Sequence, residues 1–289
     1  MTRSISTPGM GHLSMISLTA VTNLNPMGTI DEKENGVNRL YKASLEGQIE
    51  LVQILLNQGA EINAQGGEHG CALEAAAYHG HSNVVQLLLD HGAGSDLYDS
   101  KALRAASYGN NENEAAVQTL LSWGADPNIQ GGICGNALQA ASHRGHAKVV
   151  RLLVEGGADI NAQGGIYHNA LWAASYLGRE NVVQTLLDMG AEVNPRGPYS
   201  SALYVASREG REGVVRMLLE KGADVNEPGR SYSSALQAAS FAGYDKVVRL
   251  LLAWGADANA PGGKYGSALQ AALSRGHDQV VRLLETSEN

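Results

Sequence analysis

The residues Gly135-Asn-Ala-Leu-Gln-Ala-Ala-Ser-His-Arg-Gly-His146, followed by Ala147-Lys-Val-Val-Arg-Leu-Leu-Val-Glu-Gly156, decide the fold of this chain. Asn136 is a small polar residue placed to cap a short helix, and Gly145 is placed to end it. In the second part, apolar residues recur at helical spacing until Gly156. The paired glycines Gly164 and Gly165, further along, favour a tight turn because glycine adopts positive φ freely. The stretch therefore predicts a helix, a second helix and a projecting finger.

The same pattern returns along the chain with a period of about 33 residues, which is typical of repeat architectures. Neither helix alone could bury its apolar face, so consecutive units are expected to stack into a one-dimensional solenoid. We expect eight units, of which the first and last depart from the pattern and would act as caps. The opening leucine of each unit is Leu40, Leu73, Leu103, Leu138, Leu171, Leu203, Leu236 or Leu269.

Composition and charge exclude several classes of protein. The 289 residues carry 29 acidic and 21 basic side chains, a net charge of -8, which argues against a basic surface for nucleic acid or for an anionic membrane. Two cysteines are too few for a disulfide framework, and no apolar run is long enough for a membrane span. We therefore expect a soluble intracellular protein, cytoplasmic or nuclear, whose acidic net charge favours partners with exposed basic or apolar segments.

The units resemble ankyrin repeats, whose consensus runs near G-T-P-L-H-L-A-A-x-x-G-H. The resemblance covers about 250 of the 289 residues and recurs in all eight units. This chain has Gln139, Gln237 and Gln270 where the family usually has histidine, and this variety resembles arrays of filamentous fungi. The resemblance implies an all-α solenoid of helix-turn-helix units joined by β-hairpin-like fingers. It also implies that partners bind on the concave groove lined by first helices and finger tips.

Two columns of repeated polar residues are expected to be structural. Histidines of the family's Gly-His position should tie neighbouring loops together, and asparagines that follow each second helix should bond backbone groups of the fingers. Basic side chains on the outer face of second helices are expected to be solvated. The histidines are His81, His146 and His277; the asparagines are Asn63, Asn128, Asn161, Asn194, Asn226 and Asn259; the outer arginines are Arg151, Arg216, Arg249 and Arg282.

Two variable columns of the first helices are the candidate binding positions. One follows the opening leucine and the other comes four residues later, so both lie on one helical face. Aromatic and arginine side chains concentrate there, as binding hot spots require. The alternative is that these rings pack between first helices or under fingers. The expected partner-binding residues are Trp172, Tyr176, Tyr204, Arg208 and Phe241, with Tyr199 and Tyr232 from a finger column that also contains Tyr167 and Tyr265.

Catalytic signatures are absent: the sequence has no H-E-x-x-H, C-x-x-C, P-loop or G-x-S-x-G motif. We therefore predict a non-catalytic module that binds a protein or peptide in the groove, with no cofactor and no metal. The alternative is a small-molecule-binding protein or an unusual enzyme that uses the groove of units two to five. Its candidate acid–base residues are Glu74, Tyr78, Arg104, Tyr108 and His143.

Residues 1–35 lie before the repeats, and the repeat domain is expected to span 36–289. The leader is expected either to be disordered or to pack on the first unit or in the groove. The third unit has a finger that is three residues shorter than usual, and two extra residues between its helices. Either these changes compensate each other, or they bend the array and widen the groove beside Asp99, Arg104, Tyr108 and His143.

Overall fold

A computed structural model describes residues 32–94, 96–109, 113–195, 201–228 and 234–287, and within them the chain forms sixteen helices in eight consecutive pairs. Each pair is one of the eight predicted units. The first helices are α1 (Glu32–Leu45), α3 (Ala72–His79), α5 (Asp96–Tyr108), α7 (Ala137–Arg144), α9 (Ala170–Leu177), α11 (Ala202–Arg208), α13 (Ala235–Ala242) and α15 (Ala268–Leu273). The second helices are α2 (Ile49–Asn57), α4 (Ser82–Asp90), α6 (Glu114–Ser122), α8 (Ala147–Glu155), α10 (Glu180–Asp188), α12 (Glu212–Glu220), α14 (Asp245–Ala253) and α16 (Asp278–Ser287).

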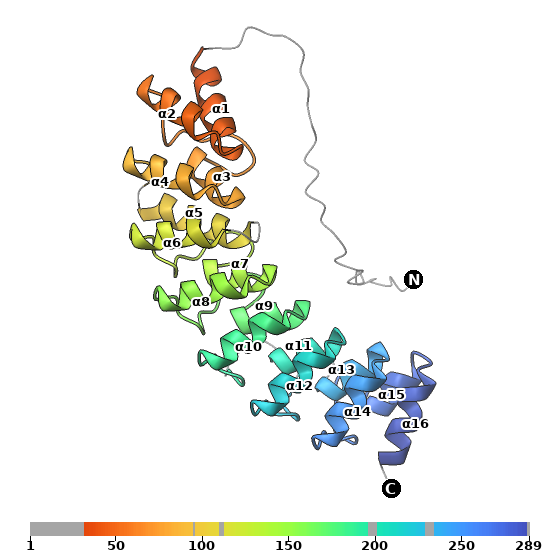
Figure 1. The fold of residues 1–289 in the computed structure, drawn as a ribbon. Coiled ribbons are helices and arrows are strands. Elements are labelled where there is room, and N and C mark those ends of the chain that lie inside the picture. The colour runs from red at the N-terminus through yellow and green to blue at the C-terminus, as the bar shows by residue number, and fades with distance from the viewer. Residues whose placement is uncertain (1–31, 95, 110–112, 196–200, 229–233, 288–289) are drawn as a thin grey trace, which may run out of the picture.

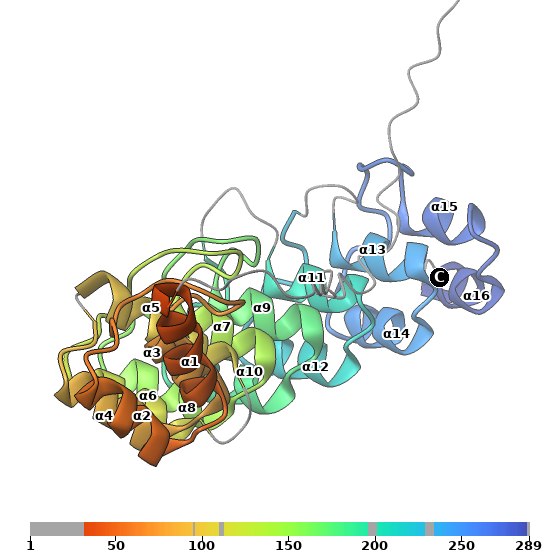
Figure 2. The same cartoon turned by 90° about the horizontal axis from the view of Figure 1, so that it is seen from above.

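The pairs stack side by side in a curved row (Figure 1). The first helices lie on the inner, concave side of the curve and the second helices on the outer side. Seen from above, the loops between successive pairs reach past the layer of first helices (Figure 2). The predicted all-α solenoid is therefore confirmed.

The core forms because each unit contributes leucines that close against alanines of its neighbours. Leu138 and Leu153 of the fourth unit are almost completely buried, and Ala140 and Ala141 have no exposed surface. Alanine at these positions lets adjacent helices approach closely, so few aromatic rings are needed in the core. No helix in the described part of the chain combines the length and the apolar character that a membrane span requires.

The local signals that predict the helix ends are confirmed. Asn136 Oδ1 accepts a hydrogen bond from the Gln139 amide at 2.9 Å, and Gln139 Oε1 accepts one from the Asn136 amide at 2.8 Å. This reciprocal cap begins α7. Gly145 ends the helix in the left-handed conformation at φ 89°.

Both predicted polar ladders are present. The His81, His146 and His277 rings donate from Nε2 to the carbonyls of Leu45, Gly109 and Phe241 in the preceding unit, at 2.8–3.0 Å. Where histidine is replaced, other side chains make an equivalent bond, notably Asn113, Arg179 and Arg211 to the carbonyls of Tyr78, His143 and Tyr176. The asparagine ladder bonds the loop of the next unit at Asn63, Asn128, Asn161, Asn194 and Asn226.

The fingers are short hairpin-like loops. Each of four described tips is closed by one backbone hydrogen bond across it, and two of these tips form isolated antiparallel bridges. The bonds run from Gly66 to Gly70, from Gly131 to Gly135, from Gly164 to His168 and from Gly262 to Gly266, at 2.8–2.9 Å. The β-hairpin-like character implied by the resemblance is confirmed at these tips.

The third unit replaces its finger with helix. Its first helix, α5, begins at Asp96, and the other first helices from α3 onward begin directly before their opening leucine. The shortened loop without paired glycines therefore continues as helix. Whether this widens the groove stays a prediction, because the Asp99 side chain lies outside the described residues. The predicted leader lies outside them as well, except that α1 already begins at Glu32.

Candidate functional site

The first variable column mainly holds the next finger in place. Gln139 has no exposed surface, and its Nε2 donates to the carbonyls of Gly164 at 2.9 Å and His168 at 3.0 Å. Gln237 donates to Ala260 in the same way at 2.9 Å. At Gln139 and Gln237 the helix position after the opening leucine therefore lies beneath the following finger.

Tyr204 occupies this column and is only 3% exposed. The expectation of an accessible ring is therefore wrong for Tyr204, whose side chain is packed in the interior. Trp172, in the same column, is half-buried, and its indole Nε1 is buried without a hydrogen-bond partner. The alternative that such rings are packed away from the groove is supported for Tyr204 by this burial.

The second variable column lies on the inner face, and its rings contact those of the neighbouring unit. The ring of Tyr108 stacks on His143 with centroids 5.6 Å apart, and His143 lies 4.7 Å from Tyr167 of the next finger. Tyr167 is 6.3 Å from Trp172, which stacks on Tyr176 at 5.4 Å and an interplanar angle of 10°. We call these five rings the aromatic track. It crosses the first helices of units three to five without a gap.

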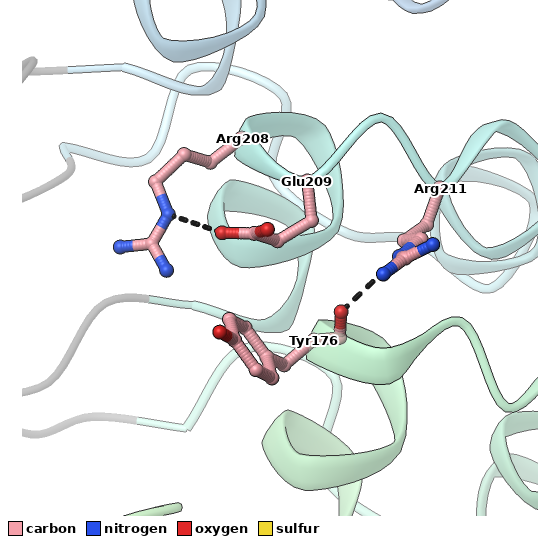
Figure 3. A network of polar contacts seen from close by, with 4 residues as sticks. All are labelled: Tyr176, Arg208, Glu209 and Arg211. Carbon is pink, nitrogen blue, oxygen red and sulfur yellow. Dashed lines mark hydrogen bonds and ion pairs between the residues drawn. The ribbon is translucent and has the colours of Figure 1, made fainter. Parts of the chain in front are cut away.

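Arginines lie at both ends of the aromatic track. The Arg144 guanidinium is centred 5.0 Å from the ring of Tyr108, and that of Arg208 is 5.8 Å from Tyr176. Figure 3 shows the second end, where Arg208 Nε donates to Glu209 at 2.8 Å and Arg211 Nε donates to the Tyr176 carbonyl at 3.2 Å. The contact between Arg208 and Tyr176 extends the track from unit five to unit six.

Two isoleucines form the finger side of this surface. Ile133 and Ile166 occupy adjacent finger tips, are 69% and 56% exposed, and are joined by a hydrogen bond from the Ile166 amide to the Ile133 carbonyl at 3.1 Å. The tips approach closely at Gly165, which has φ 57° and where an added Cβ would lie 2.6 Å from the Cys134 backbone. The sequence analysis missed the isoleucines, although two isoleucines at equivalent tip positions are a visible signal.

His168 is a second residue that the sequence analysis missed. It has φ 62°, the single positive value for a non-glycine residue in the described chain, at a position that Gly70, Gly135 and Gly266 fill in other fingers. Such a conformation is unfavourable for a side chain with a Cβ. Its ring meets Trp172 edge-on at 5.0 Å. A histidine at the finger's glycine position is the sequence signal that would have found it.

The aromatic track is electrically neutral at pH 7. Burial, with the nearby Arg179 and Arg144 charges, lowers the pKa of His143 to about 4. Burial raises the pKa of Tyr167 to about 12, and it also raises the pKa of Tyr108. Neutral, half-buried rings suit apolar stacking on a ligand better than proton transfer at neutral pH.

The alternative acid–base candidates include two neighbouring pairs, Glu74 with Arg104 and Tyr108 with His143. Glu74 lies beside Cys71, which donates to it at 3.7 Å, and burial raises the pKa of this carboxyl. Arg104 lies beneath the fourth unit's finger, since a Cβ added at Gly131 would be 3.1 Å from its Nη1. Tyr78 stacks on His69 at 4.2 Å, and Tyr108 stacks on His143 as part of the track. Within the described residues, no hydrogen bond joins two of these five side chains.

The remaining expected residues form a second, smaller cluster or lie outside the description. Phe241 stacks on Tyr265 at 4.7 Å, and the Arg275 guanidinium is centred 4.7 Å from the Phe241 ring. Tyr199 and Tyr232 lie outside the described residues. Among the residues that the structure describes, no group of three or more histidine, cysteine, aspartate or glutamate side chains could hold a metal ion.

A family model described as ankyrin repeats matches the chain in overlapping segments that together span residues 10–262. "Ankyrin repeat and SAM domain-containing protein 6" of Rattus norvegicus is 34% identical over 85 residues, which is 29% of this chain and 9% of that protein. "Azaphilone pigments biosynthesis cluster protein L" of Monascus ruber is 60% identical over 60 residues, which is 18% of this chain and 13% of that protein. The matched segments are thus a small part of both relatives.

The human ASB11 ankyrin repeat domain has a similar solved structure, with a TM-score of 0.59 and 23% identity. The likeness covers 85% of this chain and 96% of that one. It therefore supports the architecture over almost the whole array.

Proposed function

Since the chain belongs to the ankyrin repeat family, whose fold generally serves protein–protein interaction, we propose that it binds a protein or peptide segment without catalysis on the inner face of units three to six. The single observation that carries the proposal is the aromatic track, which runs unbroken from Tyr108 to Tyr176 and ends on Arg208. Four of its five rings belong to the first helices α5, α7 and α9, which lie on the inner side of the curved array (Figure 1).

The energetics of binding favour this surface. Tyrosine, tryptophan and arginine bury a large area with few rotatable bonds, so they lose little entropy when a partner covers them. The rings of the track are half-buried, which holds them in position and leaves one side accessible. The exposed tips of Ile133 and Ile166 add apolar surface beside Tyr167. A partner would therefore meet a preorganised surface rather than mobile side chains.

The test begins with selection of peptides from a displayed random library on the full chain, followed by calorimetry of a selected peptide. Tyr176→Ala should weaken binding by about 2 kcal/mol or more, as loss of a hot-spot ring does. Trp254→Ala is the matched control, because Trp254 is a 46% exposed ring at the end of α14 on the outer layer. The Tyr176 carbonyl that Arg211 bonds is retained in the variant, so the fold should persist.

Circular dichroism of both variants would check folding before affinities are compared. Equal affinity for Tyr176→Ala and the unaltered protein would remove the track from the binding surface. A selected peptide that loses affinity only with Trp254→Ala would move the binding site to the outer layer. Failure of the library to yield any specific peptide would contradict the proposal as a whole.

A further inference from the structure

The inner layer of units four to six differs in charge from the rest of the protein. The whole chain has more acidic than basic residues and a net charge of -8. The first helices of these units and the turns that follow them, residues 137–146, 170–179 and 202–211, contain four arginines and one glutamate. They are Arg144, Arg179, Arg208 and Arg211, with Glu209. A local excess of positive charge therefore borders the aromatic track.

Most of this positive charge has no acidic partner within the protein. In the described residues, three of the four ion pairs join side chains of the outer layer: Lys148 with Glu114, Arg216 with Glu212, and Lys221 with Asp188. The fourth joins Arg208 to Glu209. Arg144, Arg179 and Arg211 are exposed and take part in none of the ion pairs of this described part.

The structural role of these arginines does not require a charge. Arg179 Nε and Arg211 Nε each donate one hydrogen bond to a carbonyl of the preceding unit, at 3.2 Å. His146 makes the equivalent bond at 2.8 Å with a ring whose pKa burial lowers. A guanidinium has five N–H donors in a planar fork that matches a carboxylate, and the ladder bond uses only one of them. The ladder therefore uses Nε of Arg179 and Arg211 and leaves their two terminal nitrogens for a carboxylate.

Several acidic groups in the neighbouring loops make other contacts, whereas Glu180, which follows Arg179, is exposed and lies against Gly213 at the start of α12. Asp126 and Asp159 each accept a hydrogen bond at 2.9 Å from a backbone amide of their own loop, at Asn128 and Asn161. Glu212 pairs with Arg216 on the outer layer. The three unpaired arginines therefore present positive charge next to neutral rings, and an acidic ligand would complement both features.

We propose that the inner face of units three to six binds an acidic peptide segment of a partner protein. An apolar or aromatic side chain of that segment lies on the aromatic track, and its carboxylates bind Arg144, Arg179 and Arg211. This rests on the proposed function and adds the charge of the partner. The net charge of the chain led us to expect basic segments in the partner. Charges more than about 8 Å apart are largely screened at physiological salt, so the arginines at the surface itself decide which partner charge is attracted.

The test uses three series of fluorescent synthetic peptides that share a central Trp-Leu pair and differ only in flanking glutamate, lysine or serine. Adjacent helices are spaced by about 10 Å, so the surface is about 30 Å long and about ten extended residues cover it. Binding to the full chain would be followed by fluorescence polarisation. We expect the glutamate series to bind about tenfold more tightly than the others, and to weaken severalfold between about 50 mM and about 300 mM salt.

Two double variants separate local charge from total charge. Arg144→Gln with Arg179→Gln should reduce the affinity of the glutamate series about tenfold. Arg151→Gln with Arg249→Gln makes the same change on the exposed outer side of α8 and α14, and should leave affinity unchanged. The salt titration of the unaltered protein tests the same point without any substitution, should the first variant fold poorly.

The outcomes separate this inference from the proposed function. If the lysine or serine series binds as tightly as the glutamate series and Tyr176→Ala still abolishes binding, the proposed function stands and the acidic partner is overturned. Absence of binding by every series, while a library-selected peptide still binds through Tyr176, overturns the inference alone, and failure of the library as well overturns both. Tighter binding of a fluorescent oligouridylate than of the glutamate series also overturns the inference, since the surface would then prefer a nucleic acid.

Discussion

The inner and outer layers of this array contain similar residue types but use them differently. On the outer layer Trp123 and Trp254, each 46% exposed, end the second helices α6 and α14, and within the described residues neither ring contacts another. On the inner layer the rings of Tyr108 to Tyr176 contact one another across three units. The proposed binding surface thus differs from the outer layer in the continuity of its aromatic contacts and not in the exposure of single rings.

The difference has a physical origin in how the units stack. Second helices repeat nearly the same apolar residues, and Val149, Val150 and Leu153 of α8 are all buried between neighbours. Substitution of these buried apolar residues of the second helices would disrupt the core. The first helices pack against the second helices on one side only. Accessible positions on their other, inner side can therefore vary without loss of stability. We therefore expect substitutions in the two layers to separate folding from binding.

The largest effect is expected for Leu186→Ala in α10. Leu186 has no exposed surface, and removal of a buried leucine leaves a cavity that typically lowers the free energy of unfolding by about 2–5 kcal/mol. Tyr176→Ala, in the first helix of the same unit, should lower it by less than about 1 kcal/mol, since the ring is half-buried. Urea unfolding followed by circular dichroism measures both. Equal losses would show that the track is part of the core.

A smaller loss is expected for Gln139→Ala, which tests the buried side of the first helices. Its amide bonds the Gly164 and His168 carbonyls and completes the cap of α7. The substitution removes these bonds and leaves the buried Asn136 amide without its cap partner, so it should lower the free energy of unfolding by about 1–3 kcal/mol. Gln270→Ala in the last unit is the control, because Gln270 is exposed. An unchanged stability for Gln139→Ala would mean that water replaces the lost bonds.

The stacked fold could be predicted from the sequence because its signals are local and repeated. Glycines that end helices, small residues that cap them and leucines at fixed spacing each act within one unit, and Asn136, Gly145 and Leu153 do what their types indicate. Repetition then fixes the stacking. The ladder bonds of His81 and His146 follow from the same regularity.

The site was less predictable because it depends on contacts between units. Tyr204 and Tyr176 are both tyrosines of first helices, yet Tyr204 is buried and Tyr176 is half-buried. Helical spacing alone assigns the two columns to one face, so it does not reveal this difference. The track also needs Tyr167 from a finger to fill the gap between His143 and Trp172. How closely a finger approaches its neighbour is a property of the stack, so no single unit reveals it.

The pH dependence of stability tests the environment of the inner rings. The pKa of His143 falls from its ordinary value of 6.5 to about 4 in the folded protein. Between these values the unfolded chain binds a proton that the folded chain does not, so this residue makes stability rise with pH from about 4 to about 6.5 and stay constant above. Because the group is partly solvated, the effect should be smaller than that of Gln139→Ala.

Melting temperatures at pH 7 and at about pH 4.5 measure this contribution. On acidification the unaltered protein should lose more stability than His143→Gln, which has no proton to take up. Contributions from the rest of the chain are common to both proteins and cancel in the difference. A difference in melting temperature that is the same at both pH values would show that His143 is more accessible to solvent than the structure indicates.

The smallest effect is expected for Arg216→Gln on the outer layer. Arg216 Nη2 pairs with Glu212 at 3.1 Å within α12, and both side chains are substantially exposed, at 52% and 39%. Solvent screens such a pair, so its removal should change the free energy of unfolding by about 0.5 kcal/mol or less, and less still at high salt. It should also leave the affinity of the acidic peptide series unchanged, although the substitution removes the same unit of charge as Arg144→Gln. A clear loss of affinity with Arg216→Gln would mean that the total charge of the protein attracts the partner. The inner and outer layers would then differ in their aromatic contacts but not in how their charges act on the partner.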